Sequence, residues 1–101
     1  MTNVSFQFCD DGSVVFECEN HSGDHDTCTI CSTLCNVLAC EVIRHGRAPA
    51  IYKEGHVLIS GDKSEREVFI AVLETFKALE SMTNKVRAHV EGSVMYNTSV
   101  S

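Results

Sequence analysis

The chain has 101 residues, which suffices for one small domain with one hydrophobic core, so we expect no second domain. Its composition, 44% hydrophobic and 22% charged, is typical of a soluble globular protein and not of a disordered or membrane chain. The formal net charge of -6 argues against a ligand with a phosphate backbone. We therefore expect no direct nucleic-acid binding and no membrane insertion, whereas a basic partner is compatible with this charge.

The first four residues, Met1 to Val4, contain no basic region followed by an apolar core. We therefore predict no signal peptide and a cytoplasmic location. In a reducing compartment the six cysteines must be explained without disulfides, as buried small hydrophobes, metal ligands or nucleophiles.

Two elements are predicted in the first half of the chain. Apolar residues alternate with polar ones over 4–8 and again over 14–19, and the turn-forming residues 10–12 separate the two segments, so we predict a β-hairpin. From about Thr29 the apolar period becomes helical and continues to His45, where Gly46 provides a stop.

The second half repeats this pattern. Residues 48–52 and 56–60 bracket Glu54 and Gly55 and predict a second hairpin, with Pro49 limiting its first strand to an edge or a strand start. Ser64 and Glu67 match a capping box at the start of a long helix. Its apolar stripe consists of Phe69, Val72, Leu73, Phe76, Leu79 and Met82.

A last strand is predicted over residues 86–90, before a polar tail that begins at Gly92. The expected order is ββαββαβ, which favours an α+β fold: a two-layer sandwich of a mostly antiparallel sheet with two helices on one face. We assign residues 1–92 to this single domain and predict that residues 93–101 form a flexible C-terminal tail.

The segment 21–38, HSGDHDTCTICSTLCNVL, carries the candidate chemistry. A loop with two histidines and two aspartates leads into an apolar helix whose first turn is expected to hold Cys31. The positive end of the helix dipole favours thiolate over thiol, and a nearby imidazole could accept the proton.

Within this segment, residues 30–38, ICSTLCNVL, resemble the VCAxxSxL motif of the ribosomal-processing cysteine proteases of the Prp family. His21 follows the second predicted strand, where that family has its catalytic histidine in a Gly-His-Ala motif. The resemblance covers about residues 3 to 91. This chain departs from the family's pattern at Asn20, Ser22, Cys28 and Cys35, and its loop before Cys31 is about two residues shorter.

The resemblance implies a dimeric cysteine endopeptidase that needs no cofactor and trims an N-terminal extension from a large-subunit ribosomal protein precursor. It implies Cys31 as nucleophile and His21 as general base, with backbone N–H groups of the helix start binding the oxyanion. Asp26 is the preferred orienting group because it lies closer to the helix start than Asp24. A phage capsid or scaffold protein is an equally suitable substrate.

Other interpretations remain open. His21, His25, Cys28 and Cys31 are four zinc-competent ligands, although eleven consecutive residues leave little chain to surround one ion. A redox role for Cys28 and Cys31 lacks a thioredoxin-like βαβ pattern around it. A third interpretation is a catalytically silent dimeric interaction module of the same fold. The remaining cysteines (Cys9, Cys18, Cys35 and Cys40) are expected to be packing residues, and His45, His56 and His89 to be solvated.

Overall fold

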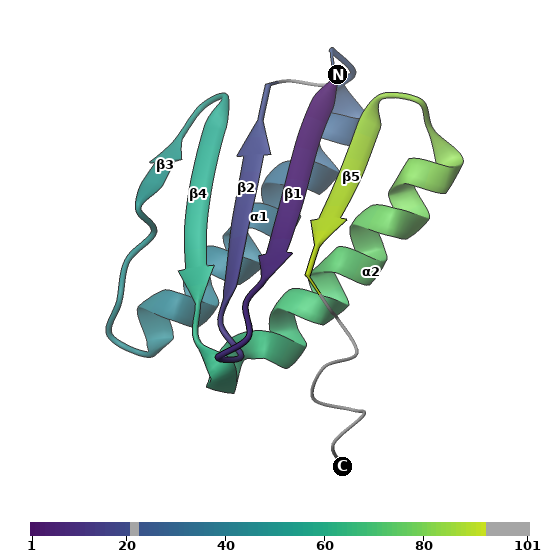
Figure 1. Ribbon diagram of the computed structural model, residues 1–101. Helices are drawn as coiled ribbons and strands as arrows, with labels where there is room; N and C mark the ends of the chain where they lie inside the picture. Colours follow the sequence, from purple (N-terminus) through teal and green to yellow (C-terminus); the bar gives the residue numbers. More distant parts are fainter. Residues whose placement is uncertain (21–22, 93–101) are drawn as a thin grey trace.

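The computed structural model describes residues 1–20 and 23–92 (Figure 1). Its elements in chain order are β1 (Thr2–Phe8), β2 (Val14–Glu19), α1 (His25–Arg44), β3 (Ile51–Lys53), β4 (His56–Gly61), the 3-10 turn η1 (Lys63–Glu65), α2 (Arg66–Met82) and β5 (Val86–Glu91). They form an α+β fold with one sheet and both helices on one of its faces, which confirms the predicted ββαββαβ order. The predicted tail, 93–101, lies outside the described residues.

The five strands form one mixed sheet in the order β3-β4-β2-β1-β5. Three of the four strand pairs are antiparallel, and two of these, β1 with β2 and β3 with β4, are hairpins. The pair of β1 with β5 is parallel. The chain runs from β4 to the edge strand β5 through α2 (Figure 1). The first and last strands are therefore neighbours, with Val4 opposite Ala88.

The core lies between the sheet and the two helices. Strands β1 and β2 bury alternate residues because successive side chains of a strand point to opposite faces. Phe6 and Phe16 of the sheet pack on each other with ring centroids 4.9 Å apart, and Phe16 packs on Phe76 of α2 at 5.9 Å. The core closes around this aromatic group, which joins both layers.

The opposite face of the sheet carries no helix in the described part of the chain (Figure 1). Its side chains are mostly polar, as expected for the solvated face of such a sheet. They include Asn3, Ser5, Gln7, Glu17, Glu19, His56, Arg87 and His89.

Helix α1 begins at His25, four residues before the start expected from the apolar period. The reason is Asp24, whose carboxylate accepts hydrogen bonds from the backbone N–H and the hydroxyl of Thr27, at 3.0 and 2.6 Å. This is an N-cap, and it allows the polar residues His25 and Asp26 to form the first turn. The periodicity of apolar residues could not detect a polar first turn.

The start of the second helix also differs from the prediction. The capping box is formed by Asp62 and Glu65 around η1, not by Ser64 and Glu67. At the other end, Met82 was expected to belong to the buried stripe, but its side chain is 80% exposed because it lies in the last turn of α2. Cys40 was expected to be a packing residue and is exposed on α1.

Three histidines that were expected to be solvated and unpartnered each have a carboxylate neighbour. Nδ1 of His45 lies 2.5 Å from Oε2 of Glu65, and Nε2 of His56 lies 2.6 Å from Oε2 of Glu17. His89 is paired with Glu91 at 3.5 Å. The sequence pattern missed Glu65 and Glu17 because they are 20 and 39 residues away from His45 and His56 in the chain. Glu91 is two residues from His89 on the same strand, and the His89 side chain is 69% exposed, as expected.

Helix α1 is long and apolar enough, by length and composition alone, to pass for a membrane span, which the sequence analysis did not anticipate. A third of this apolar stretch is buried inside the fold, and its buried apolar residues are part of the core. The core helix of a soluble domain can have the same length and composition, so this helix does not indicate a membrane protein.

Candidate functional site

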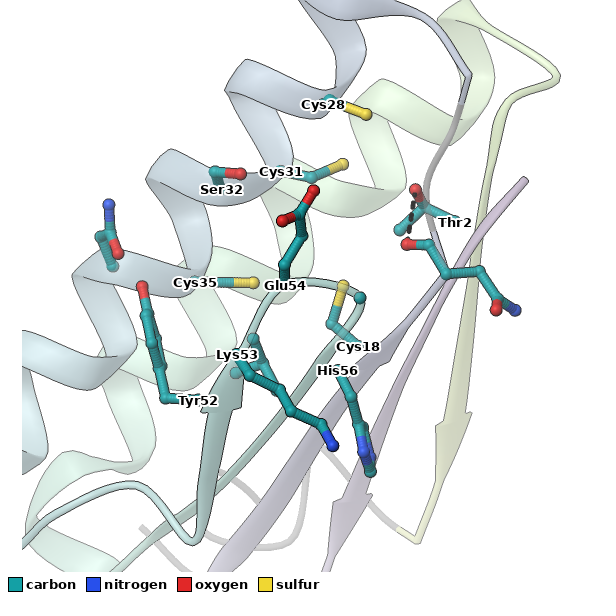
Figure 2. A pocket seen from close by; sticks show the side chains of 14 residues that line it. Thr2, Cys18, Cys28, Cys31, Ser32, Cys35, Tyr52, Lys53, Glu54 and His56 are labelled. Carbon is teal, nitrogen blue, oxygen red and sulfur yellow. Dashed lines mark hydrogen bonds between the residues drawn. The ribbon is translucent and has the colours of Figure 1, made fainter.

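A cleft of about 360 Å³ separates α1 from the turn that joins β3 and β4 (Figure 2). Four of the six cysteines line it: Cys18, Cys28, Cys31 and Cys35. Three of them come from successive turns of α1, and Cys18 comes from β2 below. The hairpin contributes polar side chains on the other wall, namely Tyr52, Lys53, Glu54 and His56. The cleft therefore contains the segment that the sequence analysis singled out.

Cys31 lies in the second turn of α1, and its sulfur points into the cleft (Figure 2). The residue is only 5% exposed. The candidate nucleophile is thus shielded from bulk solvent but faces a cavity, which is a position from which a bound peptide could be reached.

The ionisation of Cys31 differs from the expectation. Burial, together with the neighbouring thiols of Cys18 and Cys28, raises the pKa of Cys31 to about 11. The helix dipole acts mainly on the first turn, and because α1 begins at His25 this turn ends before Cys31. The described surroundings therefore favour the thiol and not the thiolate at neutral pH.

The position of Cys31 also changes the expected oxyanion site. In an α-helix only the first four N–H groups lack an intrahelical acceptor, and the N–H of Cys28 already bonds the carbonyl of Asp24 at 2.9 Å. The N–H groups around Cys31 are hence committed to the helix. Ser32 and Asn36, which also line the cleft, carry side-chain donors on the α1 wall.

The predicted general base, His21, lies outside the described residues. Its predecessor, Asn20, lines the cleft and adopts a left-handed backbone with φ of 72°. Two bonds fix Asn20 at the rim: its N–H bonds Gly55 O at 3.0 Å, and its carbonyl accepts from the Thr2 hydroxyl at 3.5 Å. Asn20 is thus held at the edge of the cleft.

The two aspartates proposed as orienting groups have different positions. Asp24 is engaged as the N-cap of α1, and its hydrogen bonds from the Thr27 hydroxyl and N–H lower its pKa. Asp26 is exposed in the first turn and does not line the cleft. It precedes Cys31 by five residues, which places it about 140° around the helix from that thiol. The carboxylate that does extend toward Cys31 belongs to Glu54 (Figure 2).

The two described histidines of this region, His25 and His56, do not face the thiol of Cys31. His25 is exposed in the first turn of α1. His56 lines the cleft, but its Nε2 is bound to Glu17, and its ring is turned away from Cys31 (Figure 2). A base for Cys31 is therefore not supplied by a histidine of the described segments 1–20 and 23–92.

The zinc interpretation was tested on those of its ligands that the structure describes. His25, Cys28 and Cys31 do not converge: within the described residues, the group whose ligand atoms all lie within 4.8 Å of one another consists of Glu17, Glu19 and His56. That group lies on the open face of the sheet, where carboxylates are solvated. His21, the fourth ligand considered, is not among the described residues.

Sequence reasoning missed the contribution of Cys18, Tyr52 and Glu54 to this cleft. One usable signal was present: Cys28, Cys31 and Cys35 share a helix face by their spacing, and the strand alternation turns Cys18 toward the helices. The contribution of Glu54 depends on how the hairpin turn approaches α1, which no local pattern encodes.

Comparison of the chain with protein-family models, with curated proteins and with solved structures gives no match.

Proposed function

We propose that this protein is a cysteine endopeptidase of Prp type, with Cys31 as nucleophile and His21 as general base. The single observation that supports it best is the orientation of the Cys31 sulfur into a cleft of about 360 Å³. That volume falls in the range of ligand pockets. The resemblance of residues 30–38 to the family motif supplies the reaction type.

A thiol with a pKa of about 11 cannot act as a preformed thiolate, so deprotonation accompanies attack. The Sγ–H proton passes to the His21 imidazole while Sγ bonds to the scissile carbonyl carbon. The imidazolium then protonates the leaving amine as the C–N bond breaks, which leaves a thioester on Cys31. Water, deprotonated by the same imidazole, hydrolyses the thioester and restores the thiol. No cofactor enters this cycle.

The substrate we propose is a basic protein segment, such as the N-terminal extension of a large-subunit ribosomal protein precursor in the cytoplasm. The net charge of -6 favours the approach of such a segment. A phage capsid or scaffold precursor with a basic terminus meets the same requirement. Asp26 or Glu54 would orient the imidazole, and only Glu54 of these two lines the cleft.

We further propose that the active form is a homodimer paired through α1. Six exposed residues recur on its outer surface with alternating spacings of four and three: Asp26, Ile30, Thr33, Val37, Cys40 and Arg44. Such a heptad stripe is typical of helix–helix contacts. Ile30 and Val37 are 42% and 43% exposed, which is unusual for apolar side chains on a fully partnered helix.

Charge complementarity favours a second copy as the partner of this stripe. If two α1 helices pair antiparallel about Cys35, Asp26 of one copy meets Arg44 of the other at both ends, and Ile30 meets Cys40. The antiparallel helix dipoles also attract. Sedimentation of D26R should show a weakened dimer, and D26R/R44D should recover it. A monomer in the unsubstituted protein would contradict this pairing.

A catalytically silent dimeric module of the same fold is the second candidate, and the raised pKa of Cys31 is the observation that favours it. A direct assay separates the two. Purified protein is incubated with ribosomal proteins that carry basic N-terminal extensions, and new N-termini are sought by mass spectrometry.

Proteolysis predicts new termini that disappear in C31A and H21A but persist in C9S, which removes a thiol outside both the cleft and the proposed dimer stripe. No new termini from a folded, dimeric protein would assign the silent module.

A further inference from the structure

The thiols of Cys18 and Cys35 lie on opposite sides of the floor of the cleft, with the Cys35 sulfur directed toward Cys18 (Figure 2). Cys18 comes from β2 and Cys35 from α1, so their approach is created by the packing of the helix on the sheet. The two side chains are 8% and 4% exposed, and both line the cleft. Two buried sulfurs from different elements thus form a pair that the proposed peptide cleavage does not use.

A third thiol lies beside this pair. Cys31 precedes Cys35 by four residues, one helical turn, and both are on the buried face of α1. The charge on Cys31 is coupled to that on Cys18. The three sulfurs do not all lie within 4.8 Å of one another, so they form a three-thiol site only if a side chain rotates.

Such a pair suits a soft cation. Thiolates select soft ions such as univalent copper, and this ion accepts two sulfur ligands in a linear arrangement. Zinc normally requires four ligands in a tetrahedron, which the described residues do not assemble here.

We propose that Cys18 and Cys35 bind one univalent soft metal ion, with Cys31 able to join as a third ligand after rotation of its side chain. Binding releases the two thiol protons to solvent and transfers no electron, so the ion remains univalent. The site lies inside the cleft, and occupation would therefore compete with a bound peptide. The proposal does not depend on peptide cleavage.

The test uses the full chain, reduced and free of oxygen, with Cu+ buffered by a chromogenic chelator. We expect the protein to withdraw one Cu+ per chain from the chelator. C18S and C35S should each weaken binding about a hundredfold, because one of only two primary ligands is lost. C40S and C9S remove thiols outside the cleft and should bind as the unsubstituted protein does.

Equal binding by C35S, or a comparable loss in C40S, would overturn the assignment. If C18S or C35S fails to fold, X-ray absorption spectroscopy of the copper complex of the unsubstituted protein serves as the test instead. Two or three sulfur neighbours of the copper ion are expected, whereas nitrogen neighbours would point to a histidine site and overturn the assignment. C31S separates this proposal from the proposed protease, since it should end cleavage but retain Cu+ binding with a smaller loss of affinity.

Discussion

Nδ1 of His45 lies 2.5 Å from Oε2 of Glu65, a carboxylate with no exposed surface. His45 ends α1, and Glu65 precedes α2, so this contact joins the two helices at the end of the fold away from the cysteine cleft. Arg47 contacts the second oxygen of the same carboxylate. The backbone N–H of Asp62 adds a hydrogen bond of 2.9 Å. Both oxygens of this buried carboxylate are thus paired.

The pH dependence of stability should report this cluster. Burial alone would raise the pKa of Glu65, but the bonds from Arg47, His45 and Asp62 outweigh it and lower the pKa to about 2. A lowered folded-state pKa stabilises the fold fully above the unfolded value of 4.5. We therefore expect the free energy of unfolding to decline as the pH falls from about 4.5 toward about 2, as measured by urea denaturation at several pH values.

E65Q should remove most of this decline. It should also lower the free energy of unfolding by about 3 kcal/mol near neutral pH, because it leaves Arg47 and His45 without their charged partner. E67Q changes an exposed carboxylate of the next turn and serves as the control. An equal pH slope in E65Q and the unsubstituted protein would show that other groups govern acid unfolding.

Gly61 at the end of β4 allows α2 to approach the sheet. A Cβ atom at this position would lie 2.4 Å from Cε1 of Phe69, well inside van der Waals contact. G61A should therefore reduce the free energy of unfolding by about 2 kcal/mol through overpacking. The matched control is S60A, at an exposed neighbouring position. Similar stabilities for the two variants in thermal denaturation would argue that α2 shifts without cost.

The N-cap of α1 provides a third prediction. D24A removes the acceptor of both Thr27 bonds and should lower Tm by a few degrees, whereas D24S retains a capping oxygen and should largely preserve it. D26A, which changes an exposed residue of the first turn and leaves the Asp24 cap in place, should have the smaller effect. Because α1 carries three thiols of the cleft, D24A should also accelerate alkylation of Cys28.

The reactivity of Cys31 should depend on His21. With a pKa of about 11, about one thiol in ten thousand is ionised at pH 7 if no base assists. The rate of Cys31 alkylation in H21A, followed by mass spectrometry, should then rise about tenfold per pH unit up to pH 10. In the unsubstituted protein the rate should be higher at neutral pH and should depend less steeply on pH.

Cys9 is the internal reference for this experiment, because it lies outside both the cleft and the proposed dimer stripe. Identical pH profiles of Cys31 in the two proteins would remove His21 from the proposed mechanism.

The architecture was accessible from the sequence because its signals are local. Alternation over β1 and β2 and the turn residues between them specify the first hairpin, and the Phe69–Leu79 period specifies α2. The helix starts were wrong where polar residues form the first turn, as at His25. The buried state of Glu65 was not predictable, since its partner Arg47 is 18 residues away in the chain.

The candidate site was predictable in part. The segment that contains Cys31 does line the cleft, but the effect of burial on its pKa opposes the expected effect of the helix dipole. That balance depends on Cys18, which approaches Cys31 only through helix–sheet packing. A one-dimensional pattern carries no information on which distant thiol will lie beside which.

The parallel pairing of β1 with β5 has a consequence for synthesis. Thr2 is aligned with Val86, so the earliest strand acquires its second neighbour only after some eighty further residues have been translated. Until then one edge of β1 is open to pairing with other chains. We infer that a ribosome-bound nascent chain remains incompletely protected against aggregation until β5 emerges, although β1, β2, α1 and the second hairpin, which together line the cysteine cleft, are already available to fold.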